Sequence, residues 1–277
     1  MTTVARLLAG ARQRISASEA RLLLGHVLGR NAAWLEAHRD DEVPVASEFS
    51  ALVGRRAAGE PIAYLMGVRE FYGRDFAVSP NVLIPRPETE LLVDIAKTKV
   101  GARETARALD LGTGSGCLAV TLALELPRVR VTAVDVSPAA LEVARGNALR
   151  LGATVEFVES DWFAALSPQP FDLIVANPPY VAAGDPHLDE GDLQFEPVGA
   201  LTDPSDEGDG LSAIRRIVAD APLWLMPQGW LFFEHGYDQA TAARQLLEAA
   251  GFSEIEQQRD LAGIIRASGG RYCISRE

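Results

Sequence analysis

The chain has 277 residues and a formal net charge of −12, and 48% of its residues are hydrophobic and 23% charged. This composition is typical of a soluble globular protein of one or two domains, and no apolar run of about 18 residues predicts a transmembrane helix. The two cysteines give no disulfide framework, and the four histidines show no ligand spacing with them, so we expect no structural zinc or other metal.

The charge is unevenly distributed along the chain. Residues 1–79 carry ten arginines and nine acidic residues, whereas the remainder carries 16 basic and 29 acidic residues. Because attraction to phosphates dominates nucleic-acid binding, the acidic second part argues against duplex DNA or bulk RNA as a partner. The N-terminus lacks the charged-then-apolar pattern of a signal peptide, so we expect a cytoplasmic protein.

The first 75 residues predict helices and contain no strong strand signal. The predicted helices are residues 4–15, residues 18–28 with Ser18 as cap and Gly29 as stop, residues 32–35 with Asn31 as cap, and residues 46–58. We interpret residues 1–75 as a small helical domain that binds or orients a partner. A bundle that only stabilises the rest of the chain is the alternative interpretation.

The pattern changes after this helical part. Residues 71–78 alternate enough to predict a hairpin, with Gly73 at its turn. Pro87 then suits the first turn of a helix, where acidic side chains favour the helix dipole. We therefore expect a hairpin linker over residues 76–90 and a second domain over residues 91–277.

From residue 105 onward, strands and helices alternate, which predicts an α/β domain with a parallel sheet. The predicted strands are residues 106–111, 129–135, 155–159, 171–176, 230–234, 255–259 and 272–275, and the predicted helices are residues 117–125, 139–151, 211–224 and 239–250. Residues 181–210 have little periodicity, and a loop of this length is usually functional. We interpret them as a lid or substrate rim, with a floppy acidic insertion as the alternative.

A glycine-rich turn follows the first predicted strand and opens a helix; it consists of Gly112, Thr113, Gly114, Ser115 and Gly116. Alternating glycines let the backbone approach a ligand closely, and free N–H groups at the helix start can receive a polar group. Asp135 ends the next strand, near the spacing at which an acidic residue accepts hydrogen bonds from ribose hydroxyls. The pattern indicates an adenosine-containing ligand without choosing between NAD and S-adenosylmethionine. Capping of the next helix is the alternative role for Asp135.

Two further residues point to the same ligand. Asp161 and Trp162 follow the third predicted strand, whose end flanks the adenine position in this topology. Asp161 could accept a hydrogen bond from the adenine amine, and Trp162 could cover the ring. A tryptophan at the edge of the core is the alternative interpretation.

The fourth strand leads into Asn177, Pro178, Pro179 and Tyr180. Open α/β sheets build their sites at such strand ends. The side-chain carbonyl of Asn177 and the backbone carbonyl of Pro178 offer two acceptors, and Tyr180 offers a flat face. This arrangement suits a planar amide or amine whose nitrogen is held for an electrophile. A Pro-Pro turn that merely leaves the strand is the alternative.

Taken in order, these motifs resemble the release-factor glutamine methyltransferases, often called HemK or PrmC proteins, over essentially the whole chain. The matching segments are residues 67–71, 84–90, 110–116, 160–163, 177–180, 195–197 and 234–236. The resemblance implies a seven-stranded class I, Rossmann-like, methyltransferase domain behind a small N-terminal helical bundle. Ile264 and Ile265 depart from the more polar residues expected there, which puts the boundaries of the last strands in doubt.

The resemblance also implies a substrate, a cofactor and a set of site residues. The substrate would be the glutamine of the Gly-Gly-Gln motif in class 1 peptide chain release factors, methylated on its side-chain amide. The cofactor would be S-adenosylmethionine, with S-adenosylhomocysteine as product. The implied cofactor contacts are residues 112–116, Asp135, Trp162 and Asn177, and the implied glutamine site is residues 177–180.

Three other functions stay open at this point. An N6-adenine methyltransferase acting on DNA or RNA could use residues 177–180, here called the clamp, to hold the amine of a flipped base, although the net charge of −12 opposes this function. A nicotinamide enzyme or a non-catalytic nucleotide-binding module would fit the glycine turn but has no use for the clamp. Methylation of further glutamine-containing proteins is compatible with every motif.

Overall fold

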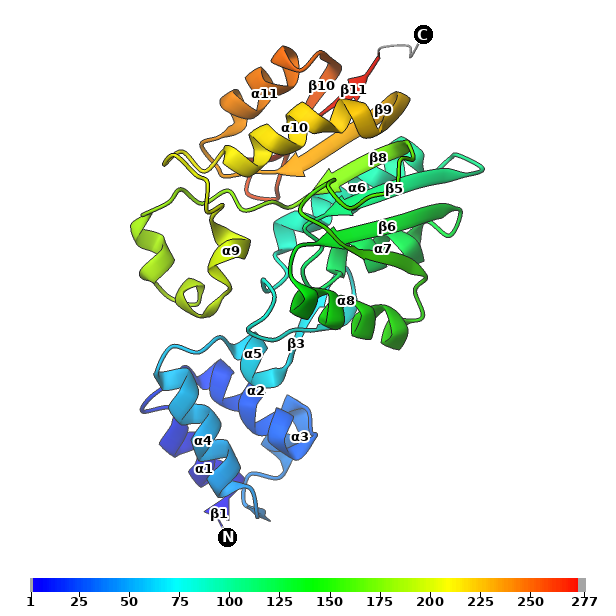
Figure 1. Ribbon diagram of the computed structural model, residues 1–277. Helices are drawn as coiled ribbons and strands as arrows, with labels where there is room; N and C mark the ends of the chain where they lie inside the picture. The colour runs from blue at the N-terminus through cyan, green and yellow to red at the C-terminus, as the bar shows by residue number, and fades with distance from the viewer. Residues whose placement is uncertain (1, 274–277) are drawn as a thin grey trace. The chain divides into compact units, whose positions relative to one another are not determined.

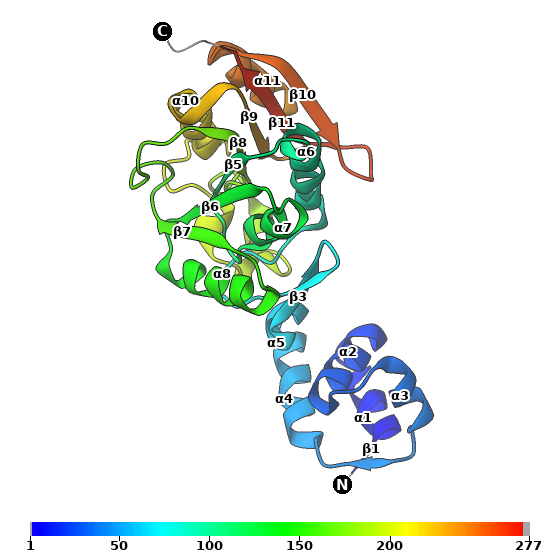
Figure 2. The same ribbon diagram turned by 90° about the vertical axis from the view of Figure 1, so that its right-hand side faces the viewer.

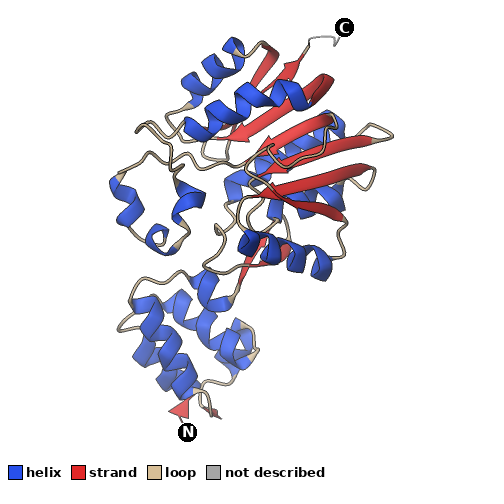
Figure 3. Ribbon diagram, in the orientation of Figure 1, coloured by secondary structure: helices blue, strands red, loops and turns tan. Residues whose placement is uncertain are grey.

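The computed structural model describes residues 2–273, and contacts divide the chain into two compact units. The first unit contains the chain up to Val68 together with the segment Asp189–Phe195, and the second contains Arg69–Leu188 and the chain from Glu196 onward. The short segment therefore packs with the N-terminal helices although it lies far from them in sequence. Figure 3 shows that the first unit is almost entirely helical.

The first unit is a bundle around its own apolar core, which includes Leu23, Leu24 and Phe49. Its helices are α1 (Val4–Ala11), α2 (Ala17–Leu28), α3 (Ala32–Ala37), α4 (Ala46–Ala57) and α5 (Ile62–Met66), beside the short strands β1 (Thr2–Thr3) and β2 (Glu42–Val43). Gly29 and Asn31 end and begin helices as the sequence predicts. The prediction of Ser18 as the cap of α2 was wrong, because Ser16 forms a reciprocal capping box with Glu19.

Within this unit the segment Asp189–Phe195 contacts the end of α4. Arg56 donates from Nη1 to the Asp192 carboxylate at 3.1 Å. The φ angle of Gly59 is +100°, and a Cβ there would lie 3.1 Å from the Phe195 ring. A glycine therefore lets the chain turn closely against this aromatic side chain.

The second unit begins within a hairpin, whose first residue Val68 is the last of the first unit's N-terminal stretch, and a helix follows. Strands β3 (Val68–Phe71) and β4 (Arg74–Ala77) form the hairpin, and the 3-10 turn η1 (Pro87–Thr89) leads into α6 (Glu90–Val100). Pro87 occupies the first turn, as the sequence predicts.

The second unit is built on a seven-stranded, mostly parallel sheet with the order β10-β11-β9-β8-β5-β6-β7, which confirms the predicted α/β class (Figure 1). The strands are β5 (Ala106–Leu111), β6 (Val129–Asp135), β7 (Val155–Glu159), β8 (Phe171–Ala176), β9 (Leu225–Glu234), β10 (Phe252–Arg259) and β11 (Ile265–Tyr272). Strand β11 runs antiparallel to both of its neighbours. The strand order reverses between β5 and β8, which is where α/β sheets bind ligands.

Helices cover both faces of the sheet (Figure 2). The helices are α7 (Cys117–Glu125), α8 (Pro138–Leu151), α10 (Ser212–Trp224) and α11 (Ala240–Ala249), and the connection after β8 holds η2 (Pro186–Asp189), η3 (Leu193–Phe195) and α9 (Val198–Leu201). One core packs α6 and α7 on the sheet, and the other packs α10 and α11 on the opposite face. No helix among residues 2–273 is long and apolar enough to cross a membrane.

The predicted boundaries were wrong in the last three strands: β9 begins at Leu225 and not at residue 230, β10 begins at Phe252 and not at residue 255, and the last strand is displaced altogether. The sequence predicts a strand over residues 272–275, whereas β11 covers Ile265–Tyr272, and residues 274–277 lie outside the described part. Strand β11 contains Gly269 and Gly270, which weaken a strand signal. A Cβ at Gly269 would lie 2.2 Å from the Phe232 ring, so the large aromatic of β9 occupies the space of the missing side chain.

Candidate active site

A cavity of about 510 Å³ lies at the carboxyl ends of β5, β6 and β8, at the point where the strand order reverses. All of its lining residues belong to the second unit. It brings together nine predicted site residues, namely Gly112, Thr113, Gly114, Ser115, Asp135, Asp161, Trp162, Asn177 and Pro179. Gly116, Pro178 and Tyr180 do not line it: Gly116 packs against Ala144, Pro178 is buried, and Tyr180 is half-buried.

The glycine turn has the backbone that its sequence predicts. Gly112, Gly114 and Gly116 have φ angles of +72°, +54° and +79°, a region that favours glycine. No atom lies within 4 Å of a Cβ built on Gly114, so this part of the turn is open to a ligand. At Gly116, in contrast, a Cβ would lie 2.9 Å from the Ala144 Cβ, which couples the turn to α8.

Asp110 stabilises the glycine turn through a hydrogen bond from Thr113. It is a buried residue near the end of β5, and its carboxylate accepts a hydrogen bond from the Thr113 hydroxyl at 2.7 Å. Burial raises the pKa of Asp110 to about 7, the Thr113 bond opposes the rise, and the nearby Asp135 charge adds to it. Sequence reasoning gave no role to Asp110, although a carboxyl inside an apolar strand is a signal that could have found it.

Asp135 fixes the same turn from the neighbouring strand. Its carboxylate accepts from the Gly114 amide at 2.8 Å and from the Ser137 amide at 2.9 Å. Burial raises its pKa, while the backbone N–H bonds act in the opposite direction. The side chain that caps α8 is that of Ser137, which accepts from Ala140, and not that of Asp135. A carboxylate has about four acceptor positions, so Asp135 keeps acceptors for the hydroxyls of a ligand.

Asp161 and Trp162 line the cavity beyond β7. Trp162 has a φ angle of +49°, and its ring lies 3.6 Å from a Cβ built on Gly112, so it packs directly over the glycine turn. The Asp161 carboxylate pairs with Arg216 of α10 at 2.9 Å and is about half-exposed. An acceptor and an aromatic face therefore lie together at this end of the cavity.

The Asn177 side chain is held by a residue that sequence reasoning gave no role. Its amide nitrogen Nδ2 donates to the Thr89 hydroxyl at 3.0 Å. Thr89 is the last residue of η1 and is buried. Because the nitrogen end of the amide is committed to Thr89, the carbonyl oxygen Oδ1 is the end left for a ligand.

Glu234 holds the other end of the clamp. It ends β9, is 2% exposed, and accepts from the Tyr180 hydroxyl at 3.1 Å and from the Thr89 hydroxyl at 2.7 Å. Burial raises the pKa of Glu234 to about 7, against the two hydrogen bonds and the Arg266 charge, which lower it. Burial and the Glu234 charge also raise the pKa of Tyr180. Glu234 directly follows the apolar run of residues 230–233, and this acidic residue at the end of a predicted strand is the sequence signal that could have identified it.

Glu196 ties the long connection after β8 to the wall of the cavity. Its buried carboxylate accepts from the Ile84 amide at 2.9 Å and forms an ion pair with Arg86. Arg86 and Pro197 both line the cavity. The connection predicted to be a lid or rim is therefore an ordered wall at this point.

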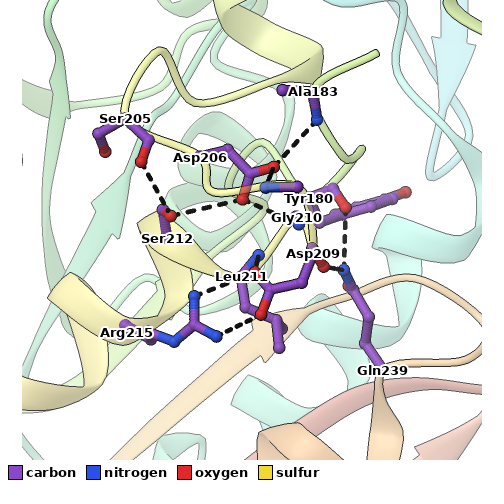
Figure 4. A network of polar contacts seen from close by, with 11 residues as sticks. Tyr180, Ala183, Ser205, Asp206, Asp209, Gly210, Leu211, Ser212, Arg215 and Gln239 are labelled. Carbon is purple, nitrogen blue, oxygen red and sulfur yellow. Dashed lines mark hydrogen bonds and ion pairs between the residues drawn. The ribbon is translucent and has the colours of Figure 1, made fainter. Parts of the chain in front are cut away.

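Further along the connection after β8, the Asp206 side chain accepts hydrogen bonds from several backbone N–H groups (Figure 4). Its carboxylate accepts from the amides of Ala183, Gly208 and Gly210, each at 2.9 Å. These three bonds tie the start of the connection to its end. They explain how a segment without hydrophobic periodicity is ordered.

Gln239 fastens the end of the clamp to the same connection (Figure 4). Its amide nitrogen donates to the backbone carbonyls of Tyr180 and Asp209, each at 3.0 Å. Its side-chain oxygen accepts from the Gly236 amide at 2.7 Å. The backbone of Tyr180 is therefore fixed from one side by Gln239, while its hydroxyl is fixed by Glu234.

Gly210 lies at the closest approach in this network, and its substitution is expected to be costly. Its φ angle is +68°, and a Cβ there would lie 2.1 Å from the Tyr180 carbonyl oxygen. We expect Gly210→Ala to lower the free energy of unfolding by about 1–3 kcal/mol, because strain and overlap add. Gly73→Ala is the matched control, since Gly73 has a nearly equal φ angle of +73° but no atom outside its chain neighbours within 4 Å of a Cβ. Equal losses in urea denaturation of both variants would contradict the proposed contact.

Comparison with known proteins places this chain in a family. Residues 87–191 match the family model described as Methyltransferase small domain, and residues 1–67 match PrmC N-terminal domain. The chain is 56% identical over 255 residues to the release factor glutamine methyltransferase of Bordetella pertussis, covering 91% of this chain and 93% of that protein. It is 53% identical over 266 residues to the protein of the same name from Burkholderia pseudomallei, covering 93% and 92%.

Solved structures share the fold at lower sequence identity. A methyltransferase from Pyrococcus furiosus matches with a TM-score of 0.56 and 20% identity, over 82% of this chain and 100% of that chain. The hMettl16 catalytic domain matches with a TM-score of 0.58 and 17% identity, over 82% and 83%. These structures support the class I methyltransferase fold that the sequence predicts.

Proposed function

We propose, because the chain belongs to the release factor glutamine methyltransferase family, that it methylates the side-chain amide of a glutamine in a release factor. We further propose that this glutamine is the one in the Gly-Gly-Gln motif of class 1 release factors. The observation that carries the proposal is the Asn177 amide, which Thr89 orients at the edge of a cavity built around a glycine turn.

The residues of the cavity fit S-adenosylmethionine as the cofactor. The open space at Gly114 leaves room for close approach, and Asp135 keeps acceptor positions for ribose hydroxyls. Trp162 offers its ring to adenine, and Asp161 lies beside it as an acceptor. When bound, this cofactor supplies a methyl group already activated on a sulfonium.

The chain itself would hold and orient the glutamine nitrogen. Asn177 Oδ1 and the Pro178 carbonyl would accept the two N–H groups of the substrate amide. Tyr180 would pack on the amide plane, with its hydroxyl and its backbone both anchored. Two aimed acceptors orient the nitrogen and support the positive charge that develops on it during transfer.

The partner in this proposal is a protein in the cytoplasm. Cys117, which is buried, and Cys273, which is exposed, form no disulfide in the described part of the chain, which suits a reducing compartment. We propose no membrane or direct nucleic-acid partner. The adenine alternative requires phosphate contacts from a chain with a net charge of −12, and it predicts a steep loss of turnover with added salt.

The test is incubation of the chain with S-adenosylmethionine and a class 1 release factor, followed by tandem mass spectrometry. The expected result is one added methyl group on the glutamine of the Gly-Gly-Gln motif. A release factor with glutamate in place of that glutamine is the control. Methylation of adenine in an oligonucleotide, with an unmodified release factor, would contradict the proposal, as would calorimetric binding of NAD in place of S-adenosylmethionine.

A further inference from the structure

We propose that Thr89 and Glu234 are positioning residues for the transfer, because together they set which end of the Asn177 amide faces the substrate. This inference rests on the proposed function. The three residues come from separate parts of the second unit: Thr89 ends η1, Glu234 ends β9, and Asn177 follows β8. They form a chain of hydrogen bonds, 3.0 Å from Asn177 to Thr89 and 2.7 Å from Thr89 to Glu234.

The direction of this chain follows from which groups can donate. Above its pKa of about 7, Glu234 is ionised and its carboxylate only accepts hydrogen bonds, so the single hydrogen of the Thr89 hydroxyl goes to Glu234. The Thr89 oxygen then serves as an acceptor, and the NH2 group of the Asn177 amide is the partner that supplies a hydrogen. Asn177 therefore presents its carbonyl oxygen to the cavity, which is the end that can accept from a substrate N–H.

A single buried carboxylate orients two members of the clamp. One oxygen of Glu234 receives Thr89 and, through it, fixes Asn177, while the other oxygen receives the Tyr180 hydroxyl at 3.1 Å. Thr89 and Glu234 are each 2% exposed, so water does not take over their hydrogen bonds. Burial of a carboxyl is costly, and a fold that needed only packing here would be served by an apolar side chain.

The same pair of side chains occurs elsewhere in the sheet without a link to the clamp. The Thr132 hydroxyl of β6 donates to the Glu156 carboxylate of β7 at 3.0 Å, and Thr132 is 5% exposed. Thr132→Val therefore removes a hydrogen bond of the same chemistry from a buried threonine, whose glutamate partner Glu156 is exposed. It is the matched control for Thr89→Val, because valine keeps the shape and removes only the hydroxyl.

The test is a double-mutant cycle on methyl transfer to a release factor, with variants Thr89→Val, Asn177→Ala and their combination. We expect Thr89→Val to lower kcat by about tenfold or more, with the dissociation constant for S-adenosylmethionine within about twofold of wild type. Thr89→Ser, which restores the hydroxyl, should recover most of the activity. Thr132→Val should leave kcat within about twofold of wild type.

The cycle separates positioning from general support of the fold. If Thr89 acts through Asn177, adding Thr89→Val to Asn177→Ala should change kcat by less than about twofold. Independent losses that multiply in the double variant would overturn the inference, as would an equal loss in Thr132→Val or no recovery in Thr89→Ser. A wild-type chain that does not methylate glutamine at all would instead overturn the proposed function, so the two failures are distinguishable.

Discussion

Replacement of Asn177 by alanine is expected to remove about 2–4 kcal/mol of transition-state stabilisation, which corresponds to about a 30- to 1000-fold lower kcat. The reason is that Asn177 Oδ1 is the side-chain acceptor left for the substrate amide once Nδ2 is bound to Thr89. The measurement is the rate of methyl transfer to a release factor at saturating S-adenosylmethionine. A variant within about twofold of the wild-type rate would show that Asn177 does not act on the substrate.

The variant Asn177→Asp separates the need for an acceptor at this position from the need for a neutral amide. An aspartate keeps an acceptor but has no N–H for Thr89, so it tests the acceptor and its orientation together. We expect a rate between those of wild type and Asn177→Ala, with cofactor affinity preserved. A rate below that of the alanine variant would show that a charged acceptor harms the transfer.

Replacement of Glu234 by glutamine is expected to change the pH dependence of stability. Burial raises the pKa of Glu234 from 4.5 to about 7 in the folded chain, so the folded state binds more protons than the unfolded state between these values. The stabilising contribution of the neutral carboxyl is therefore complete below about pH 4.5 and is lost as the pH rises through about 7. Glutamine has no proton to lose and escapes this loss.

The expected size follows from the shift. Between about pH 5 and about pH 8, the free energy of unfolding of wild type should fall by up to about 3 kcal/mol more than that of Glu234→Gln. The groups that face Glu234 are Thr89, Tyr180, Glu88 and Arg266, and the variant retains all of them. Asp110, whose pKa is also raised to about 7, contributes equally to both proteins. Urea denaturation measures the difference, and parallel pH curves for the two proteins would contradict it.

The same variant is expected to lose activity while it gains stability at high pH. A glutamine amide can donate to Thr89 or to the Tyr180 hydroxyl, which reverses one of the hydrogen bonds that the carboxylate accepts. We expect a lower kcat at about pH 8 with little change in cofactor affinity. Glu159→Gln, at an exposed position, is the control for loss of one acidic group.

The sheet could be predicted well where apolar runs are bounded by turn residues. Strands β5, β6, β7 and β8 begin and end where the sequence predicts, because each is a compact run of apolar and β-branched residues. Strand β11 could not be predicted, since its small residues make room for Phe232 of the neighbouring strand. The need for small residues in β11 comes from packing against β9, so it leaves no pattern in the local sequence of β11 from which the strand could be predicted.

The site could be predicted only where its residues lie in one motif. The glycine turn and Asn177 were identified because each follows a buried strand. The partners of the clamp were not, because Thr89 is 88 positions from Asn177 and Glu234 is 54 positions from Tyr180. Their roles appear only when the fold brings η1 and β9 to the end of β8.

The central claim is that Asn177 Oδ1 and the Pro178 carbonyl hold the nitrogen of a glutamine side chain. The most direct measurement is a crystal structure of the chain with S-adenosylhomocysteine and a peptide that contains Gly-Gly-Gln. We predict that the glutamine nitrogen lies about 3 Å from both oxygens, with the Tyr180 ring against the amide plane. A glutamine bound elsewhere, or bound with its oxygen facing Asn177, would contradict the claim.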